Sequence, residues 1–291
     1  MHGSTARDRK ESDEREVEYE DSNNDYAKAF DTLGEGVALV RWHSERLLHI
    51  LCAMSNADFR GPVLLTGAGR EGQVGEAVAQ ALAKRGATLL LVDRNPDQAR
   101  DRATVLTKAG FHAFSFACDL ADVFAVGELA TRIRREHGDR LGALVHVAGG
   151  FAVTGPLAES DVDEWQRMMN INLTTAFVVT RGFLPLVRAG RGAILYFASE
   201  AALPGAKVAN VAAYAAAKSA VVTLMRAVAQ EERGNGVRAN ALAPTSIRTA
   251  ANVKSMGENV RYVEREEVAA AVAYLCSDDA SAITGQLIAL S

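Results

Sequence analysis

The chain has 291 residues, of which 48% are apolar and 23% are charged, and its formal net charge at pH 7 is −4. These proportions are typical of a globular protein whose core is large enough for independent stability. Because phosphate binding favours a basic surface, the negative balance argues against a nucleic-acid partner. No apolar run approaches the roughly 20 residues that cross a bilayer, so we expect no membrane partner.

The cysteines indicate a reducing compartment. Cys52, Cys118 and Cys276 form no Cys-x-x-Cys pair, and their number is odd. The chain opens on a charged run over residues 7–11, which is unlike a secretory signal. We therefore expect reduced thiols in a cytoplasmic protein. No group of His, Cys, Asp and Glu residues has the spacing of metal ligands, so we expect no metal site.

Two segments precede the regular part of the chain. Residues 1–35 are rich in charge and cannot bury enough apolar area to offset their ordering entropy, which predicts a disordered tail. Residues 36–58 carry apolar side chains, among them Leu39, Val40 and Leu47, that could line one face of a short helix. We predict a short helical appendage there and a single catalytic domain over residues 59–291.

Strand and helix patterns alternate along this domain. Strands are expected at 63–66, 87–92, 113–117, 143–147, 193–197, 237–242 and 286–290. Helices are expected at 74–84, 96–108, 122–136, 162–169, 173–188, 212–232 and 264–275. Because the strands are apolar on both faces, they predict an α/β fold with a parallel, doubly wound sheet of the Rossmann type. Ligands of such sheets bind at the carboxyl ends of the strands.

A glycine-rich segment joins the first of these strands to the first helix. It is Thr-Gly-Ala-Gly-Arg-Glu-Gly-Gln-Val-Gly over residues 66–75. Glycines let the backbone turn sharply and let a pyrophosphate approach the helix N-terminus, where free N–H groups and the dipole favour an anion. We therefore predict that this loop binds a dinucleotide, through Gly67, Gly69, Arg70, Gly72, Val74 and Gly75.

The second strand ends in an acidic residue that bears on the choice of cofactor. Asp93 stands where a ribose hydroxyl acceptor is expected, about 20 residues beyond the glycine loop, and its charge would repel a 2′-phosphate. Arg70 and Arg94 act in the opposite sense, because a guanidinium could bind that phosphate. We expect NAD as the cofactor, with NADP as the alternative.

Tyr214 and Lys218 are candidates for proton transfer. Their i, i+4 spacing places phenol and ammonium on one face of the predicted helix 212–232. A free tyrosine has a pKa near 10, and an adjacent cation would lower it. Tyr214 could then exchange a proton with an alcohol or carbonyl while a hydride moves to or from the cofactor. Ser199 follows the strand before this helix, where it could hold the substrate oxygen.

These segments, in this order, resemble the short-chain dehydrogenase/reductase family from about residue 62 to residue 291. The resemblance is carried by Thr66-Gly67 with the glycine loop, Cys118-Asp119-Leu120, Ala148-Gly149-Gly150, Asn172, Ser199, Tyr214 with Lys218, and Asn240-Ala241-Leu242-Ala243-Pro244 followed by Ile247-Arg248-Thr249. It implies an NAD(P)-dependent alcohol dehydrogenase or carbonyl reductase, with seven strands in the order 3-2-1-4-5-6-7.

The resemblance also implies roles for single residues. Tyr214 would be the general acid/base, Lys218 would lower its pKa and hold the nicotinamide ribose, and Asn172 would support a proton-relaying water. Further cofactor contacts are implied for Asp119 at the adenine, Ala148 and Gly149 at the ribose, Ile247 and Thr249 at the carboxamide, and for Leu120 and Pro244. A homodimer or homotetramer is implied, with the helices near Leu173 and Ala212 packed across subunits.

The chain departs from the family pattern at three places near the site, one of which is Pro244-Thr245, where the family has Pro-Gly. The glycine loop is two residues longer than usual, so the roles of its single glycines are open. His146-Val147 stands where the family has Asn-Asn, which removes side-chain amides that brace the central strand. We expect His146 to be a hydrogen-bonded core residue rather than a second acid/base.

The substrate and two other functions are left open by the sequence. We expect a small alcohol or ketone as the substrate, and Arg248 could anchor an acidic one. One alternative function is a catalytically idle dinucleotide-binding or sensing protein of the same fold. Another is a nucleotide-sugar epimerase, which would need a larger C-terminal substrate region than the fewer than ~50 residues that follow Pro244.

Overall fold

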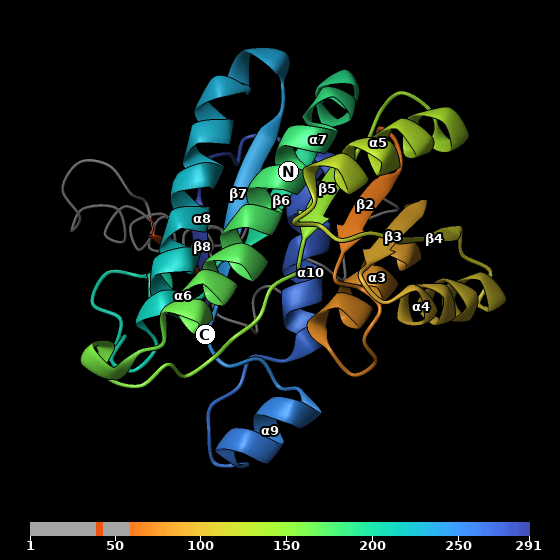
Figure 1. The fold of residues 1–291 in the computed structure, drawn as a ribbon. Helices are drawn as coiled ribbons and strands as arrows, with labels where there is room; N and C mark the ends of the chain where they lie inside the picture. The colour runs from red at the N-terminus through yellow and green to blue at the C-terminus, as the bar shows by residue number, and fades with distance from the viewer. Residues whose placement is uncertain (1–38, 43–58) are drawn as a thin grey trace, which may run out of the picture. The chain divides into compact units, whose positions relative to one another are not determined.

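The computed structural model describes residues 39–42 and 59–291, which contain one parallel sheet. Its strands follow the order β1-β8-β7-β6-β5-β2-β3-β4 (Figure 1). They are β1 (Leu39–Trp42), β2 (Val63–Thr66), β3 (Leu89–Asp93), β4 (Ala113–Ala117), β5 (Ala143–His146), β6 (Ala193–Phe197), β7 (Arg238–Pro244) and β8 (Leu287–Leu290). From β2 to β8 this order confirms the predicted fold class and strand order.

β1 is an eighth strand that we did not expect. Leu39 lies opposite Leu287 and Trp42 lies opposite Leu290, in parallel register with β8. The helix predicted over 36–58 is therefore wrong for residues 39–42. A tertiary contact explains the difference. β8 would otherwise be an edge with unpaired backbone groups, and a segment that contains Val40 and Trp42, residue types common in strands, can pair with it. The rest of that segment, and the predicted tail over 1–35, lie outside the described residues.

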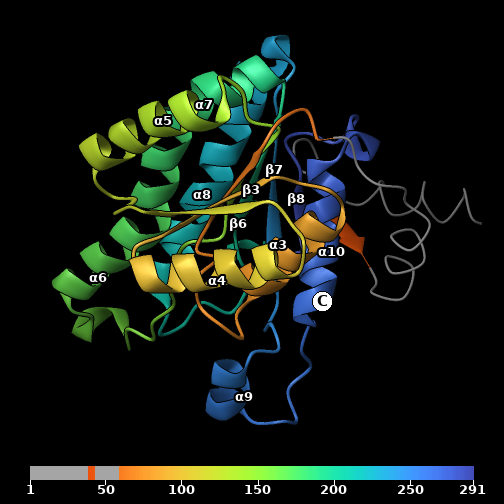
Figure 2. The same ribbon diagram turned by 90° about the vertical axis from the view of Figure 1, so that its right-hand side faces the viewer.

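Two layers of helices cover the sheet (Figure 2). Successive strand residues point to opposite faces, so Val63 and Leu65 pack in one cluster while Leu64 packs in the other. The first cluster includes residues of α3 (Val74–Lys84), α4 (Pro96–Lys108) and α10 (Arg265–Cys276). The second includes residues of α5 (Val123–His137), α7 (Thr175–Gly190) and α8 (Ala212–Glu231). The predicted helices are thus present, with bounds within two residues of those expected.

Two features of the helices were not predicted. α6 (Val162–Met169) continues into α7 through a turn of π-helix at Asn170–Thr174, and such turns are frequent at functional sites. The segment after β7 contains α9 (Ala250–Met256), which was not among the expected helices. Within the described ranges, no helix is long and apolar enough to span a membrane.

Candidate active site

The predicted site residues gather at the carboxyl ends of the parallel strands. These ends share one edge of the sheet, so segments far apart in the sequence meet there. Gly67 follows β2, Asp93 ends β3, Ala148 follows β5, Ser199 follows β6 and Pro244 ends β7. α8 brings Tyr214 and Lys218 to the same edge, because Lys218 Nζ donates a hydrogen bond of 2.8 Å to the carbonyl of Phe197 at the end of β6.

Tyr214, Ser199 and Lys218 form one contact group. Lys218 Nζ lies 5.8 Å from the centroid of the Tyr214 ring. The pKa of the Tyr214 phenol is raised, mainly by burial, while a hydrogen bond with Ser199 lowers it and the charge of Glu200 raises it. Burial alone lowers the pKa of Lys218 to about 8. The net shift of the Tyr214 pKa is thus opposite to the predicted lowering, since burial outweighs the stabilising contacts of the phenolate.

Asn172 lies in the π-helical turn and is fully engaged by protein groups. Its Oδ1 accepts a hydrogen bond from the N–H of Gly150 at 3.1 Å. Its Nδ2 donates to the carbonyls of Gly150 and Met168, both at 3.0 Å. A Cβ at Gly149 would lie 2.7 Å from Asn172 Oδ1 and 3.3 Å from Lys218 Nζ, so only glycine fits between these side chains. The loop after β5 is therefore held against both predicted catalytic residues.

His146 braces the centre of the sheet where the family has an asparagine. Its Nδ1 lies 3.1 Å from Thr66 Oγ1, and its Nε2 lies 3.3 Å from Thr175 Oγ1. Thr175 Oγ1 in turn donates to the carbonyl of Ile171 at 2.9 Å. Burial and the charge of Lys218 lower the pKa of His146 to about 3, so its imidazole is neutral. The structure supports the interpretation of His146 as a hydrogen-bonded core residue. Its imidazole makes side-chain hydrogen bonds across the central strands, a role that the family's Asn-Asn pair would otherwise fill.

The backbone of the glycine loop is suited to binding an anion at the N-terminus of α3. Gly67 has φ +72°, and a Cβ at Gly75 would collide with the carbonyl oxygen of Gly67, so the turn and the start of α3 require glycine at both positions. The N-cap residue of α3, Gln73, makes no side-chain hydrogen bond to the helix. The first N–H groups of α3 therefore have no side-chain cap, which fits a pyrophosphate at this helix end.

Carboxylates hold the rest of the loop. The N–H of Gly69 donates to Asp93 Oδ2 at 3.1 Å, and the N–H of Gly72 donates to Glu76 Oε2 at 2.6 Å. Glu76 was missed by the sequence reasoning, although an acidic residue in the first turn of the helix after the loop could have indicated it. Arg70 and Arg94 are exposed and form no ion pair with any residue in the described ranges.

The remaining predicted cofactor residues flank this edge of the sheet. Thr249 is buried and caps α9, because its Oγ1 accepts a hydrogen bond from the N–H of Asn252 at 3.1 Å. The carbonyl of Ile247 accepts one from Asn252 Nδ2 at 2.8 Å. Leu120 is buried, whereas Asp119 is exposed and its Oδ1 accepts from the N–H of Ala121 at 3.0 Å. That these residues contact a dinucleotide therefore stays a prediction.

Arg248 does not fit the hypothesis that it anchors an acidic substrate. Its Nε lies 2.7 Å from Glu264 Oε1, and its Nη1 lies 3.2 Å from Glu258 Oε2. Its guanidinium also lies over the ring of Tyr262, 4.8 Å from the centroid. Because two carboxylates already compensate its charge, Arg248 is a structural link between α9 and the segment before α10.

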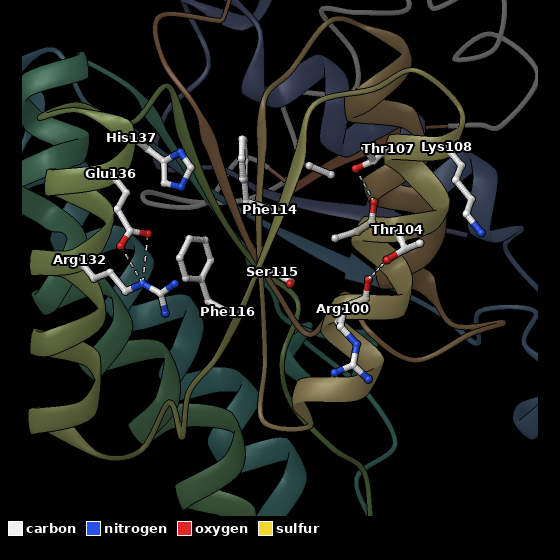
Figure 3. A pocket seen from close by; sticks show the side chains of 12 residues that line it. Arg100, Thr104, Thr107, Lys108, Phe114, Ser115, Phe116, Arg132, Glu136 and His137 are labelled. Atoms are coloured by element: carbon white, nitrogen blue, oxygen red, sulfur yellow. Dashed lines mark hydrogen bonds and ion pairs between the residues drawn. The ribbon is translucent and has the colours of Figure 1, made fainter.

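A separate groove runs along the edge strand β4 (Figure 3). Phe114 and Phe116 form its floor, and Arg132 and His137 of α5 lie against these rings. Arg132 also pairs with Glu136 at 3.1 Å. None of the predicted site residues lines this groove, so its position argues against a role in the predicted chemistry. In the part of the chain that the structure describes, no group of three His, Cys, Asp or Glu side chains could hold a metal ion.

Comparison with known proteins agrees with this geometry. Residues 67–291 match the family model described as enoyl-(acyl carrier protein) reductase. The chain is 30% identical to 2-(S)-hydroxypropyl-CoM dehydrogenase 3 of Xanthobacter autotrophicus, over 81% of this chain and 97% of that protein. It is 34% identical to D-threitol dehydrogenase of Mycolicibacterium smegmatis, over 78% of this chain and 91% of that protein.

A solved structure carries the same fold and a nicotinamide cofactor. It is a protein of Beutenbergia cavernae, proposed to be an NAD(P)-dependent gluconate 5-dehydrogenase, with NADP bound. The identity is 32% and the TM-score is 0.72, over 81% of this chain and 96% of that one. The chain therefore belongs to the short-chain dehydrogenase/reductase family and is an NAD(P)-dependent oxidoreductase that interconverts an alcohol and a carbonyl.

Proposed function

We propose that Tyr214 is the acid/base residue of this reaction and that Ser199 and Lys218 assist it. The observation that carries the proposal is the contact group of these three side chains beside the glycine loop. Ser199 acts on the Tyr214 phenol closely enough to lower its pKa, so both hydroxyl groups can reach one substrate oxygen. A donor pair placed in this way stabilises the charge that develops on that oxygen.

The protonation state of Tyr214 suits it to donate a proton to a carbonyl oxygen near neutral pH. Because burial raises its pKa, the Tyr214 phenol is protonated and can donate its proton to the substrate oxygen. When bound, the nicotinamide ring supplies or takes the hydride. Lys218, with a pKa of about 8, is mostly charged at pH 7 and can share a proton with the site as Tyr214 gives one up. Asn172 holds the π-helical turn beside them, where a relaying water could bind.

The dinucleotide would be held along the same edge of the sheet. Its pyrophosphate fits the uncapped N-terminus of α3, and Asp93 can accept hydrogen bonds from the adenine ribose. Both Asp93 oxygens already accept backbone N–H groups, of Gly69 and Asn95, and each oxygen has a second lone pair for a hydroxyl. We infer a preference for NAD, whereas Arg70 and Arg94, which form no ion pair with any described residue, are the groups that would favour NADP.

The substrate is inferred to be a small alcohol or ketone. Phe151 is 61% exposed and its ring meets the Tyr214 ring edge to face, 5.0 Å between centroids. An apolar wall of this kind suits an uncharged substrate, such as the polyol in the name of the threitol dehydrogenase relative.

We also propose a homodimer or homotetramer that works in the cytoplasm. Phe177 on α7 is 50% exposed, and Trp165 on α6 is 37% exposed, which fits a subunit contact along these helices. Cys118 and Cys276 are free and buried, which fits a reducing compartment. Light scattering tests the assembly: a Phe177→Asp variant should dissociate, and an unchanged mass would contradict this interface.

Fluorescence titration with NADH and with NADPH tests the proposed cofactor site. Tighter binding of NADH would support Asp93 as the discriminating residue, and tighter binding of NADPH would favour Arg70 and Arg94. Failure to bind either nucleotide would overturn the proposed function.

A further inference from the structure

Residues from three helices contact one another at the carboxylate of Glu76, which also contacts the glycine loop. Glu76 belongs to the first turn of α3, Arg102 to α4 and Arg265 to the first turn of α10. Arg102 Nη1 lies 2.6 Å from Glu76 Oε1, and Arg265 Nη1 lies 3.7 Å from Glu76 Oε2. The side chains of Arg102 and Glu76 are 6% and 17% exposed, so this pair is shielded from solvent.

The same carboxylate holds the glycine loop. Glu76 Oε2 accepts the N–H of Gly72 at 2.6 Å, and Gly72 has φ +71°, a conformation that favours glycine. At the other end of the lengthened part of the loop, Asp93 accepts the N–H of Gly69. Two carboxylates, from β3 and from α3, therefore fix the residues that lie between them, Arg70 and Glu71.

A lengthened loop needs such contacts if it is to bind a dinucleotide well. Each residue that is ordered only on binding costs conformational entropy, which weakens affinity, and ordering the loop beforehand removes that cost. The Gly72 hydrogen bond ties the loop to a group that Arg102 and Arg265 hold in place. Glu76 is thus linked to α4 and α10, which are parts of the rigid scaffold.

The charge of Glu76 would be expected to oppose pyrophosphate binding if it were uncompensated. Two guanidinium groups face its carboxylate, although Arg265 Nη2 also lies 3.6 Å from Glu266 Oε1. Glu76 is therefore paired inside the protein, and its contact with Gly72 is expected to outweigh its repulsion of an anion.

We propose that Glu76 is a positioning residue for the dinucleotide, which orders the lengthened glycine loop through Gly72. The proposal rests on the cofactor site proposed above. Glu76→Ala removes the acceptor and the charge, whereas Glu76→Gln keeps an amide oxygen for the Gly72 N–H. We expect the dissociation constant for reduced cofactor to rise about tenfold in Glu76→Ala, which loses the charge-assisted hydrogen bond to Gly72 completely. We expect a smaller rise in Glu76→Gln, which keeps a neutral acceptor for that bond.

Turnover separates this role from a merely structural one. At saturating cofactor, kcat of the folded Glu76 variants should stay within about twofold of the wild-type value, with KM for the cofactor raised. A purely structural role would lower the melting temperature and the active fraction and leave the dissociation constant unchanged. Glu136→Gln, which removes a carboxylate from an exposed Arg132 pair on α5, is the matched control and should bind cofactor as the wild type does.

A second variant covers the case in which loss of Glu76 prevents folding, since Arg102 would be buried without its counter-charge. A Cβ at Gly72 would meet no described atom within 4 Å, so Gly72→Ala strains only the loop backbone. Gly110→Ala has the same features, with φ +87° and open space, in the turn between α4 and β4. Gly72→Ala should weaken cofactor binding several-fold relative to Gly110→Ala.

The outcomes separate this inference from the proposed function. If the wild type binds NADH or NADPH but folded Glu76→Ala binds it equally well or more tightly, or Gly72→Ala binds like Gly110→Ala, the positioning role is wrong and the cofactor site stands. If the wild type binds neither nucleotide, the proposed cofactor site itself fails.

Discussion

The imidazole of His146 lies between two threonine hydroxyls, 3.1 Å from Thr66 Oγ1 and 3.3 Å from Thr175 Oγ1. It therefore links the residue before the glycine loop to the residue after the π-helical turn that carries Asn172. The N–H of Ala148 also donates to Thr66 Oγ1 at 3.4 Å. The glycine loop and the π-helical turn are therefore connected through one neutral side chain, that of His146.

Replacing His146 should show what this link contributes. His146→Leu would remove one hydrogen-bond partner from each of two buried hydroxyl groups, so the free energy of unfolding should fall by about 1–3 kcal/mol. His146→Asn restores the family's usual residue and some hydrogen bonding, and should lose less. Urea denaturation measures both. A His146→Leu variant as stable as the wild type would show that the link is dispensable.

His146 should also make stability depend on pH. Its pKa is about 3 in the folded protein and about 6.5 when unfolded, so the unfolded chain binds a proton that the folded chain excludes. Stability from this residue is complete above pH 6.5 and is lost as the pH falls towards 3, by about 2 kcal/mol at pH 5. Comparing denaturation of wild type and His146→Asn at pH 7 and pH 5 isolates the effect. Equal losses in both proteins would contradict the assignment.

Asp93 should set the preference between the two nicotinamide dinucleotides. Asp93→Asn removes the negative charge that opposes a 2′-phosphate but keeps an oxygen for the Gly69 N–H. The ratio of the NADPH and NADH dissociation constants should therefore shift about tenfold or more towards NADPH. Fluorescence titration of both proteins with both nucleotides gives this ratio. An unchanged ratio would mean that another residue discriminates.

Arg248 should not select acidic substrates. Because Glu258 and Glu264 already bind its guanidinium, Arg248→Gln should change kcat/KM for a hydroxy acid and for a neutral diol of similar size by the same factor. Matched steady-state measurements with the two substrates test this. A loss confined to the hydroxy acid, of about tenfold or more, would restore the substrate-anchoring role.

Much of the fold could be predicted because local pattern and tertiary structure agree. Most of the strands from β2 to β8 are apolar runs between helices with clear periodicity, and parallel sheets bury such runs on both faces. The approximate position of Ser199 relative to Tyr214 and Lys218 followed from strand ends and helix spacing. These features depend on residues close together in the sequence or on general rules of the doubly wound fold.

The features that were missed depend on contacts between distant segments. Leu39–Trp42 is a strand because β8 offers an open edge, which no local pattern reveals. Glu76 holds the glycine loop because Arg102 and Arg265 reach it from other helices. The direction of the Tyr214 pKa shift depends on how deeply the phenol is buried, and the i, i+4 spacing to Lys218 gives no information on that burial.

Pre-steady-state kinetics of Tyr214→Phe test the central claim, that Tyr214 transfers the proton. Wild type and variant are mixed with reduced cofactor and a small ketone, and cofactor oxidation is followed by absorbance, with cofactor affinity measured on the same samples. We expect unchanged affinity and a rate at least about 100-fold lower in the variant, since the acid/base group is lost. A variant that binds cofactor and reduces the ketone within about twofold of the wild-type rate would contradict this claim.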